Sequence, residues 1–293
     1  MEKIFSYLLL GLMGVVLLSC SPKQNGAKKE RPVLYVSILP EMGLAKAIVG
    51  EELEVRVLVK KNQSPHHYEP TARELAGLGD AQLLFAIGFP FEKRIIKKMQ
   101  PLYPQLRVVD VSQGITRRTM HTALHAQAET DPHIWLTLQN SAILASNMCV
   151  ALSKTYPDNA QIFQKNFMIL QGKIRQMDAK IRKALIPFSG RTFYVFHPSF
   201  GYFADAYQLK QVAVEQDGKS PSPRQLAHLI EQAKLEGAQV VLVQKSFPPK
   251  SAKAVANAIQ GKLLVLNPLA EDPLETIQKL ADALKDSWRK TIP

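Results

Sequence analysis

Short apolar runs alternate with helical segments along the chain, and the runs fall into two groups of four. They occupy residues 33–37, 55–59, 83–86 and 108–111, then 193–196, 212–214, 240–243 and 263–266. Most are continuously apolar, as parallel strands covered on both faces are. Helical patterns lie between them, for example at 42–49, 71–78, 223–236 and 251–260. This alternation predicts an α/β protein of two lobes, each with a four-stranded mostly parallel sheet flanked by helices.

The longest helical pattern separates the two groups and predicts one helix over residues 160–186, which Pro187 ends. Asp158 or Asn159 can cap its start. Its apolar residues follow steps of three and four and form one stripe: Phe163, Phe167, Leu170, Ile174, Met177, Ile181 and Leu185. Such a helix is roughly 40 Å long, so we expect it to join both lobes. A long surface helix on one lobe is the alternative.

The first 31 residues have a different character from the rest and are not expected to belong to the fold. Residues 1–19 contain a basic start and an apolar run, as a secretory signal peptide does. The ending at Cys20 resembles a bacterial lipobox, which implies lipidation of Cys20; an ordinary signal peptide is the alternative. Residues 20–31 are polar and rich in lysine, and we predict a flexible tether. The predicted domains are then an N-terminal lobe at 32–156, a linking helix at 157–187 and a C-terminal lobe at 188–293.

Composition and charge limit the possible partners. The chain of 293 residues is 46% hydrophobic, which is ordinary for a globular protein, and its net charge is +12. The basic residues are spread over the helical segments, so we expect no nucleic-acid partner and attribute the charge to proximity to anionic lipid. Only Cys149 would remain after Cys20, and we interpret it as a small core residue within an apolar helical run.

Three histidines are the candidate chemistry, because each follows a predicted strand. His66 follows the second strand, His133 lies in the long loop after the fourth, and His197 directly follows the fifth. A single histidine near a strand end is more often a hydrogen-bonded structural residue than a ligand. Ligands of open α/β sheets, however, bind beyond the carboxyl ends of the strands. Three imidazoles meeting in an interlobe cleft would bind zinc or a similar metal.

Further residues near these histidines extend the hypothesis. The fourth ligand could be water or one of three residues after the last strand: Asn267, Glu271 and Asp272. Glu69 and Asp131 could orient the ligand imidazoles, although helix capping or local turns explain them equally well. His121 and His125 lie in the loop before His133, where they could recruit metal weakly or simply be solvated.

The stretches around these histidines resemble one known family. They are 65–71 (PHHYEPT), 131–136 (DPHIWL), 197–203 (HPSFGYF) and 267–269 (NPL), with 88–92 (GFPFE) as a further match. The chain is identified as similar to the zinc-binding solute-binding lipoproteins of bacterial metal ABC importers, a family that also has manganese-binding members. The resemblance covers the chain from about residue 33 to its end. It implies two α/β lobes joined by one long helix, with metal held between them.

The resemblance also implies which residues bind the metal. Its three ligand positions fall on His66, His133 and His197, and a histidine at the third position favours Zn²⁺ over Mn²⁺. The family's fourth ligand is usually aspartate and falls on Asn267, which departs from the pattern and leaves that ligand open.

We therefore expect an exported lipoprotein, anchored in a membrane and facing the periplasm or the cell exterior. It would capture Zn²⁺ as a monomer and deliver it to an ABC importer permease in the inner membrane. The alternatives are a Mn²⁺ or Fe²⁺ carrier of the same family, or a zinc-dependent hydrolase or lyase with an open three-histidine site. We do not expect an enzyme, because the sequence has no HExxH motif, nucleophile elbow or phosphate-binding glycine loop.

Overall fold

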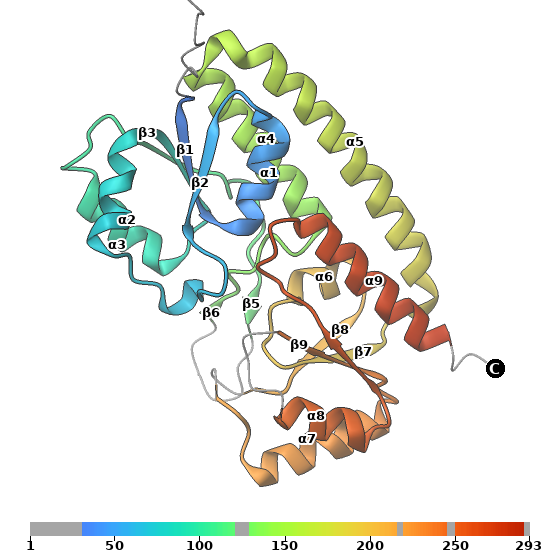
Figure 1. Cartoon of the computed structure of the whole chain (residues 1–293). Helices are drawn as coiled ribbons and strands as arrows, with labels where there is room; N and C mark the ends of the chain where they lie inside the picture. The colour runs from blue at the N-terminus through green and yellow to red at the C-terminus, as the bar shows by residue number, and fades with distance from the viewer. Residues whose placement is uncertain (1–30, 121–128, 216–218, 245–249, 290–293) are drawn as a thin grey trace, which may run out of the picture. The chain divides into compact units, whose positions relative to one another are not determined.

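The computed structural model describes residues 31–120, 129–215, 219–244 and 250–289 (Figure 1). Arg31 is the first residue of a compact unit that contains all of them. Cys20, His121 and His125 lie outside the described residues, so the predictions made for them stay predictions. Among the described helices, none combines the length and the apolarity that crossing a bilayer requires.

The first half of the described chain builds a four-stranded parallel sheet. Its strands are β1 (Val33–Ile38), β2 (Glu54–Val59), β3 (Ala81–Ala86) and β4 (Arg107–Asp110), in the spatial order β2-β1-β3-β4. The connecting helices are α1 (Leu39–Val49), α2 (Ala72–Gly77) and α3 (Pro90–Met99), with short 3₁₀ turns η1 (Pro65–His67) and η2 (Leu78–Asp80). Every residue of β1 is buried, as expected of a central strand covered on both faces.

The second half repeats this plan with a second parallel sheet. Its strands are β7 (Thr192–Val195), β8 (Lys210–Ala213), β9 (Val240–Val243) and β10 (Lys262–Val265), in the order β10-β9-β7-β8. Its helices are α6 (Gly201–Ala206), α7 (Pro223–Leu235), α8 (Lys250–Ala258) and α9 (Pro273–Arg289). The eight predicted strands are thus confirmed, with ends within two residues of those expected.

Helix α5 (Ala160–Leu185) joins the two halves, as the sequence predicted. It packs on α1 and on α4 (Leu138–Thr155) of the first half and on α9 of the second. All seven residues of the predicted stripe are buried or partly buried. Asn159 occupies the position before the helix, but its side chain donates to Glu52 Oε2 at 2.7 Å instead of capping the helix. The turns η3 (Pro157–Asn159) and η4 (Ile186–Phe188) bracket the helix.

A short antiparallel hairpin interrupts the loop before α4. It consists of β5 (Thr119–Met120) and β6 (Glu129–Thr130), and Thr119 pairs with Thr130. The hairpin leads directly into Asp131 and His133, so it fixes where the segment with the second histidine begins. The sequence did not predict it.

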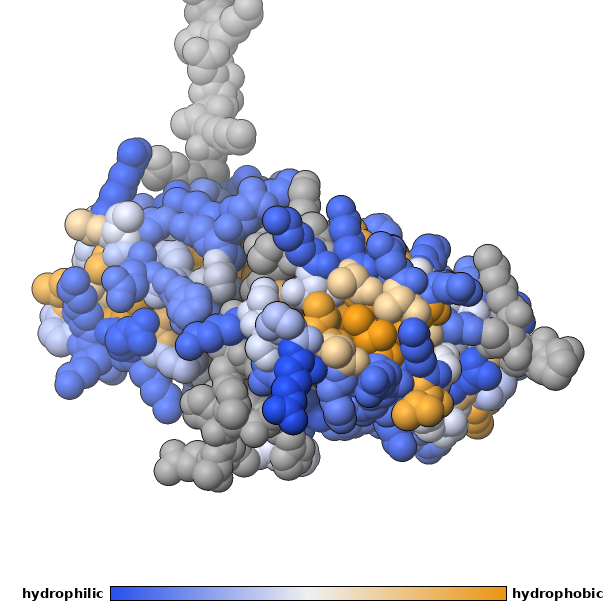
Figure 2. All heavy atoms as spheres, turned by 90° about the horizontal axis from the view of Figure 1, so that it is seen from below, coloured by the Kyte–Doolittle hydropathy of each residue, from blue (hydrophilic) through white to orange (hydrophobic). Residues whose placement is uncertain are grey.

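The apolar core is shared between the two halves. One cluster contains the first sheet, α5, α9 and one face of the second sheet, including Phe193 and Val195. Tyr194 and Phe196 point to the other face of that sheet, where a smaller cluster packs against α7 and α8. The alternation follows the two-residue period of a strand. Figure 2, turned from the view of Figure 1, shows a mainly hydrophilic face on which hydrophobic residues gather in a few separate places.

Candidate metal centre

The three predicted histidines meet in the structure. His66 lies in η1, beyond the end of β2; His133 lies between β6 and α4; His197 follows β7. One ligand nitrogen from each lies within 4.8 Å of the others. The Nε2 atom of His133 is 3.3 Å from that of His66 and 3.2 Å from that of His197. Tetrahedral zinc with bonds of 2.0–2.1 Å requires nitrogens about 3.3 Å apart, so these spacings fit a single ion.

Two buried carboxylates set the orientation of two of the rings. Asp131 Oδ1 accepts hydrogen bonds from the backbone N–H of His133, at 2.9 Å, and from its Nδ1, at 2.8 Å. Glu215 Oε1 accepts from Nδ1 of His197 at 2.6 Å. Because a neutral imidazole carries one N–H, donation from Nδ1 leaves the lone pair on Nε2. Both rings therefore present a metal-binding lone pair to the common point.

The environment lowers the pKa of two of the rings, His133 and His66. Desolvation lowers the pKa of His133 despite the opposing hydrogen bond to Asp131. Desolvation, together with the neighbouring His133 and His197, lowers the pKa of His66 to about 3. Burial opposes ionisation of Asp131, but its hydrogen bonds to His133 and Arg118 outweigh that effect and lower its pKa. A neutral imidazole beside an ionised carboxylate is the state that binds a divalent cation.

An arginine links the carboxylate behind His133 to the second lobe. Arg118 Nη1 lies 2.9 Å from Asp131 Oδ2, and its Nε lies 2.8 Å from Asp205 on α6. The Tyr202 hydroxyl donates to the backbone oxygen of Asp131 at 3.0 Å. A Cβ on Gly201 would lie 1.8 Å from Arg118 Nη1, so only glycine leaves space for the guanidinium. The orientation of His133 thus depends on contacts from both lobes.

Aromatic and acidic side chains hold the loops around the histidines. The rings of Phe89 and Trp135 lie against His66 and His133 respectively, and Trp135 Nε1 donates to the Pro268 carbonyl oxygen at 2.7 Å. Buried Glu92 accepts from the backbone N–H groups of residues 87–89, and buried Glu41 accepts from those of residues 37–38. Burial raises the pKa of both carboxyl groups.

The candidate fourth ligands have other partners. Asn267 Oδ1 accepts from the backbone N–H of Leu269, Glu271 forms an ion pair with Lys46 at 2.7 Å, and Asp272 accepts from the backbone N–H of Glu275. The metal-binding group found among the described residues contains the three histidines and no carboxylate.

Of the two candidate orienting residues, Asp131 holds His133, whereas Glu69 is exposed and bonds to no histidine in the described part of the chain. Sequence reasoning missed Glu215. The available signal was its place directly after a predicted strand of the same lobe as His197.

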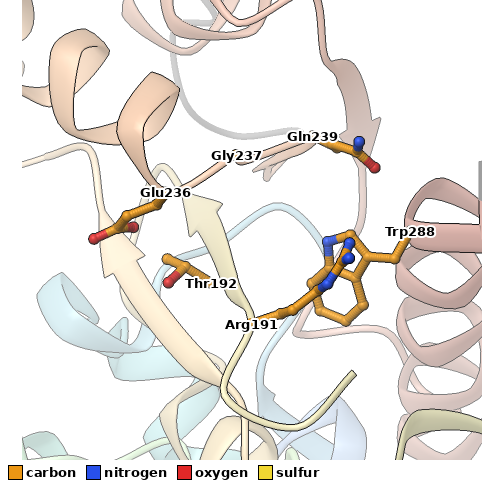
Figure 3. A pocket seen from close by; sticks show the side chains of 6 residues that line it. All are labelled: Arg191, Thr192, Glu236, Gly237, Gln239 and Trp288. Atoms are coloured by element: carbon orange, nitrogen blue, oxygen red, sulfur yellow. The ribbon is translucent and has the colours of Figure 1, made fainter. Parts of the chain in front are cut away.

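A separate cavity of about 270 Å³ lies at the amino-terminal ends of the strands of the second sheet (Figure 3). Arg191 and Gln239, which line it, precede β7 and β9, whereas His197 follows β7. The cavity is therefore not part of the histidine site.

Residues 34–287 match the family described as "Zinc-uptake complex component A periplasmic", ZnuA. The chain belongs to the ZnuA family. As a ZnuA-family protein, it is an extracytoplasmic solute-binding component of a metal ABC transporter, and its cargo is a metal ion bound at the three-histidine site. The family consists of transport proteins and not enzymes, so the hydrolase or lyase alternative has no support.

Relatives of this ZnuA-family chain differ in the metal that they are named for. A zinc-bound ZnuA deletion mutant of known structure is 32% identical, with a TM-score of 0.79, and the match covers 88% of this chain and 98% of that one. A putative metal-binding protein of Chlamydia trachomatis is 27% identical over 94% of this chain and 97% of its own. The manganese transporter lipoprotein PsaA of Streptococcus mitis is 25% identical over 87% and 86%.

Proposed function

We propose that this protein captures Zn²⁺ between its two lobes and delivers it to the permease of an ABC importer in the inner membrane. His66, His133 and His197 would supply three ligands, and water the fourth. The protein would act as a monomer, anchored in a membrane through lipidated Cys20 and facing the periplasm or the cell exterior. The lipid anchor and the monomeric state stay predictions from the sequence.

The main support for this proposal is that the Nε2 lone pairs of His133 and His197 point to the same place. Asp131 and Glu215 occupy the Nδ1–H groups of His133 and His197, so both rings direct an Nε2 lone pair to the shared point. These Nε2 atoms are 3.2 Å apart, and two lone pairs cannot form a hydrogen bond. A cation between them turns the repulsion into coordination.

The donor set favours zinc over manganese. Imidazole suits zinc, whereas manganese prefers carboxylate, carbonyl and water oxygens. Within the described residues the group has three imidazoles and no carboxylate, and Asn267 stands where the family usually has aspartate. Three protein ligands with water in the fourth position leave a route for ligand exchange, which suits a carrier that must release its ion.

Metal content tests the proposal. The protein is exported in medium that contains both zinc and manganese, purified without chelator and analysed for metals. We expect about one zinc per chain, as three-ligand sites bind, and a large loss in His197→Ala. His228→Ala removes an exposed imidazole from α7 and should keep the zinc of the wild type. Stoichiometric manganese would refute the choice of cargo, and equal metal in wild type and His197→Ala would refute the site.

A further inference from the structure

The exposed side of α5 combines basic and apolar residues without an acidic one. We call this side the α5 outer face; its residues are Ile162, Lys165, Met168, Ile169, Lys173, Arg175, Lys180 and Lys183. At 3.6 residues per turn they lie opposite the buried Phe163, Leu170 and Ile174. Ile162, Met168 and Ile169 are 42%, 59% and 64% exposed, which is unusual for large apolar side chains.

Most charges of this face have no ion-pair partner among the described residues. In the described part of the chain, Lys165, Lys173, Arg175 and Lys183 take part in no ion pair. Asp178, the one acidic residue of α5, accepts hydrogen bonds from Gln139 and Tyr207 on the buried side.

The adjacent helices add little negative charge to this face. The α4 helix, which packs against α5, contains no acidic residue. On α9, Glu275 pairs with Lys279, Asp282 and Asp286 pair with Lys285, and Asp282 also interacts with Lys180.

The chain enters the fold beside the start of this helix. Arg31 pairs with Glu51 at 2.7 Å, and the next residue, Glu52, accepts the hydrogen bond from Asn159 at the first turn of α5. The eleven residue-to-residue steps from Cys20 to Arg31 can span at most about 40 Å, similar to the length of α5, about 39 Å. A lipid on Cys20 would therefore hold the α5 outer face within reach of the same bilayer.

We propose that the α5 outer face docks on an anionic lipid surface. Lysine and arginine are attracted to acidic headgroups, and apolar side chains enter the interface between headgroups and acyl chains. A second copy of the chain would bring like charges together, and a nucleic acid would gain nothing from Ile162 and Ile169. The argument from the tether length rests on the proposed lipidation of Cys20. The argument from the residues of the α5 outer face does not. The docking goes beyond metal transport, because none of the three histidines lies on α5.

Vesicle binding by a protein without the lipid anchor on Cys20 tests this proposal. The chain from Ser21 to Pro293 contains the whole compact unit and can be sedimented with vesicles of equal parts phosphatidylglycerol and phosphatidylcholine. We expect binding to these vesicles, little to pure phosphatidylcholine, and a decrease at high salt. The triple variant Lys165→Glu, Lys173→Glu, Lys183→Glu should bind at least about tenfold more weakly. The control Lys97→Glu, Lys98→Glu, Lys253→Glu changes the net charge equally at exposed sites elsewhere.

Each result supports or overturns the docking. Retained binding by the control with loss in the α5 variant supports it, whereas equal loss in both variants shows attraction by net charge alone and overturns it. The variant Ile162→Ser, Ile169→Ser should lose the binding that persists at high salt; wild-type binding there would overturn the apolar part. Zinc titration of every variant keeps failure of docking distinct from failure of metal binding.

Discussion

At the residue scale, the site depends on two pairs of carboxylate and imidazole and one less constrained ring. His133 and His197 are fixed by Asp131 and Glu215, which are 0% and 7% exposed. His66 is the most exposed of the three, and the described residues place no carboxylate on its ring. We infer that the two held histidines form a rigid pair, to which η1 adds the third ligand. The orienting carboxylates should therefore matter nearly as much as the ligands.

The variant Glu215→Gln tests this dependence. It keeps the size of the side chain but removes the charge that makes His197 a stronger donor, so zinc should bind about 10-fold more weakly. Competition against a chromophoric chelator measures the affinity, and Glu231→Gln, an exposed position on α7, is the matched control. Unchanged zinc affinity in Glu215→Gln would show that Glu215 only holds the His197 ring in place and does not strengthen it as a ligand.

The two orienting carboxylates also show what sequence can and cannot reveal about a site. Asp131 could be proposed because it stands two residues from His133 and local geometry brings them together. Glu215 is eighteen residues from His197, and their contact requires β7 and β8 to be neighbours in the sheet. Strand order depends on tertiary packing, so the sequence pattern did not predict it. The same holds for Arg118, which meets Asp205 only across the lobes.

At the element scale, the predicted strands and the long helix follow from strong periodic patterns. Continuous apolar runs mark strands such as β9, and the stripe from Phe163 to Leu185 marks α5. The β5–β6 hairpin has two residues per strand, too few to show a period, so its pairing could not be predicted. The lobe boundaries at 156, 187 and 188 stay predictions, since the structure from Arg31 onward is one compact unit.

Substitution by alanine at two glycines within helices should change the folding stability in opposite directions. A Cβ on Gly43 of α1 would lie 1.8 Å from the backbone oxygen of Glu271, just before α9, whereas a Cβ on Gly172 of α5 would meet nothing within 4 Å. Both substitutions improve helix propensity equally. Gly172→Ala should therefore stabilise the protein by about 0.5–1 kcal/mol, and Gly43→Ala should destabilise it by about 1–3 kcal/mol. Urea unfolding of the metal-free proteins measures both; stabilisation by Gly43→Ala would contradict close packing of α1 on this loop.

At the scale of the whole molecule, several contacts connect the lobes around the metal site. Trp135 bonds to Pro268, Lys46 pairs with Glu271, and Arg118 pairs with Asp205. The largest apolar cluster continues through α5 into the second sheet. Opening of the lobes would break these contacts together, so we expect only modest movement on metal exchange. Because the whole fold brings the three histidines together, proton binding by these histidines should affect the free energy of unfolding.

This influence should depend on pH when metal is absent. The pKa of His66 is lowered to about 3 from an ordinary value of 6.5. Below about pH 6.5 the unfolded chain therefore binds a proton that the folded chain does not, and folding stability decreases as the pH falls towards about 3. Between pH 7 and 5 the full shift would correspond to about 2 kcal/mol. Because the ring is partly exposed, we expect about 1 kcal/mol.

Comparison with His66→Gln isolates this contribution. Burial raises the pKa values of Glu41 and Glu92, so these two groups make the folded state more stable as the pH falls, opposite to His66. Both proteins contain Glu41 and Glu92, so their effect cancels in the comparison. Urea unfolding of the metal-free proteins at pH 7 and 5 should show a loss about 1 kcal/mol larger in the wild type. Equal losses would mean that the metal-free protein holds its histidines apart, and that the ion itself brings them together.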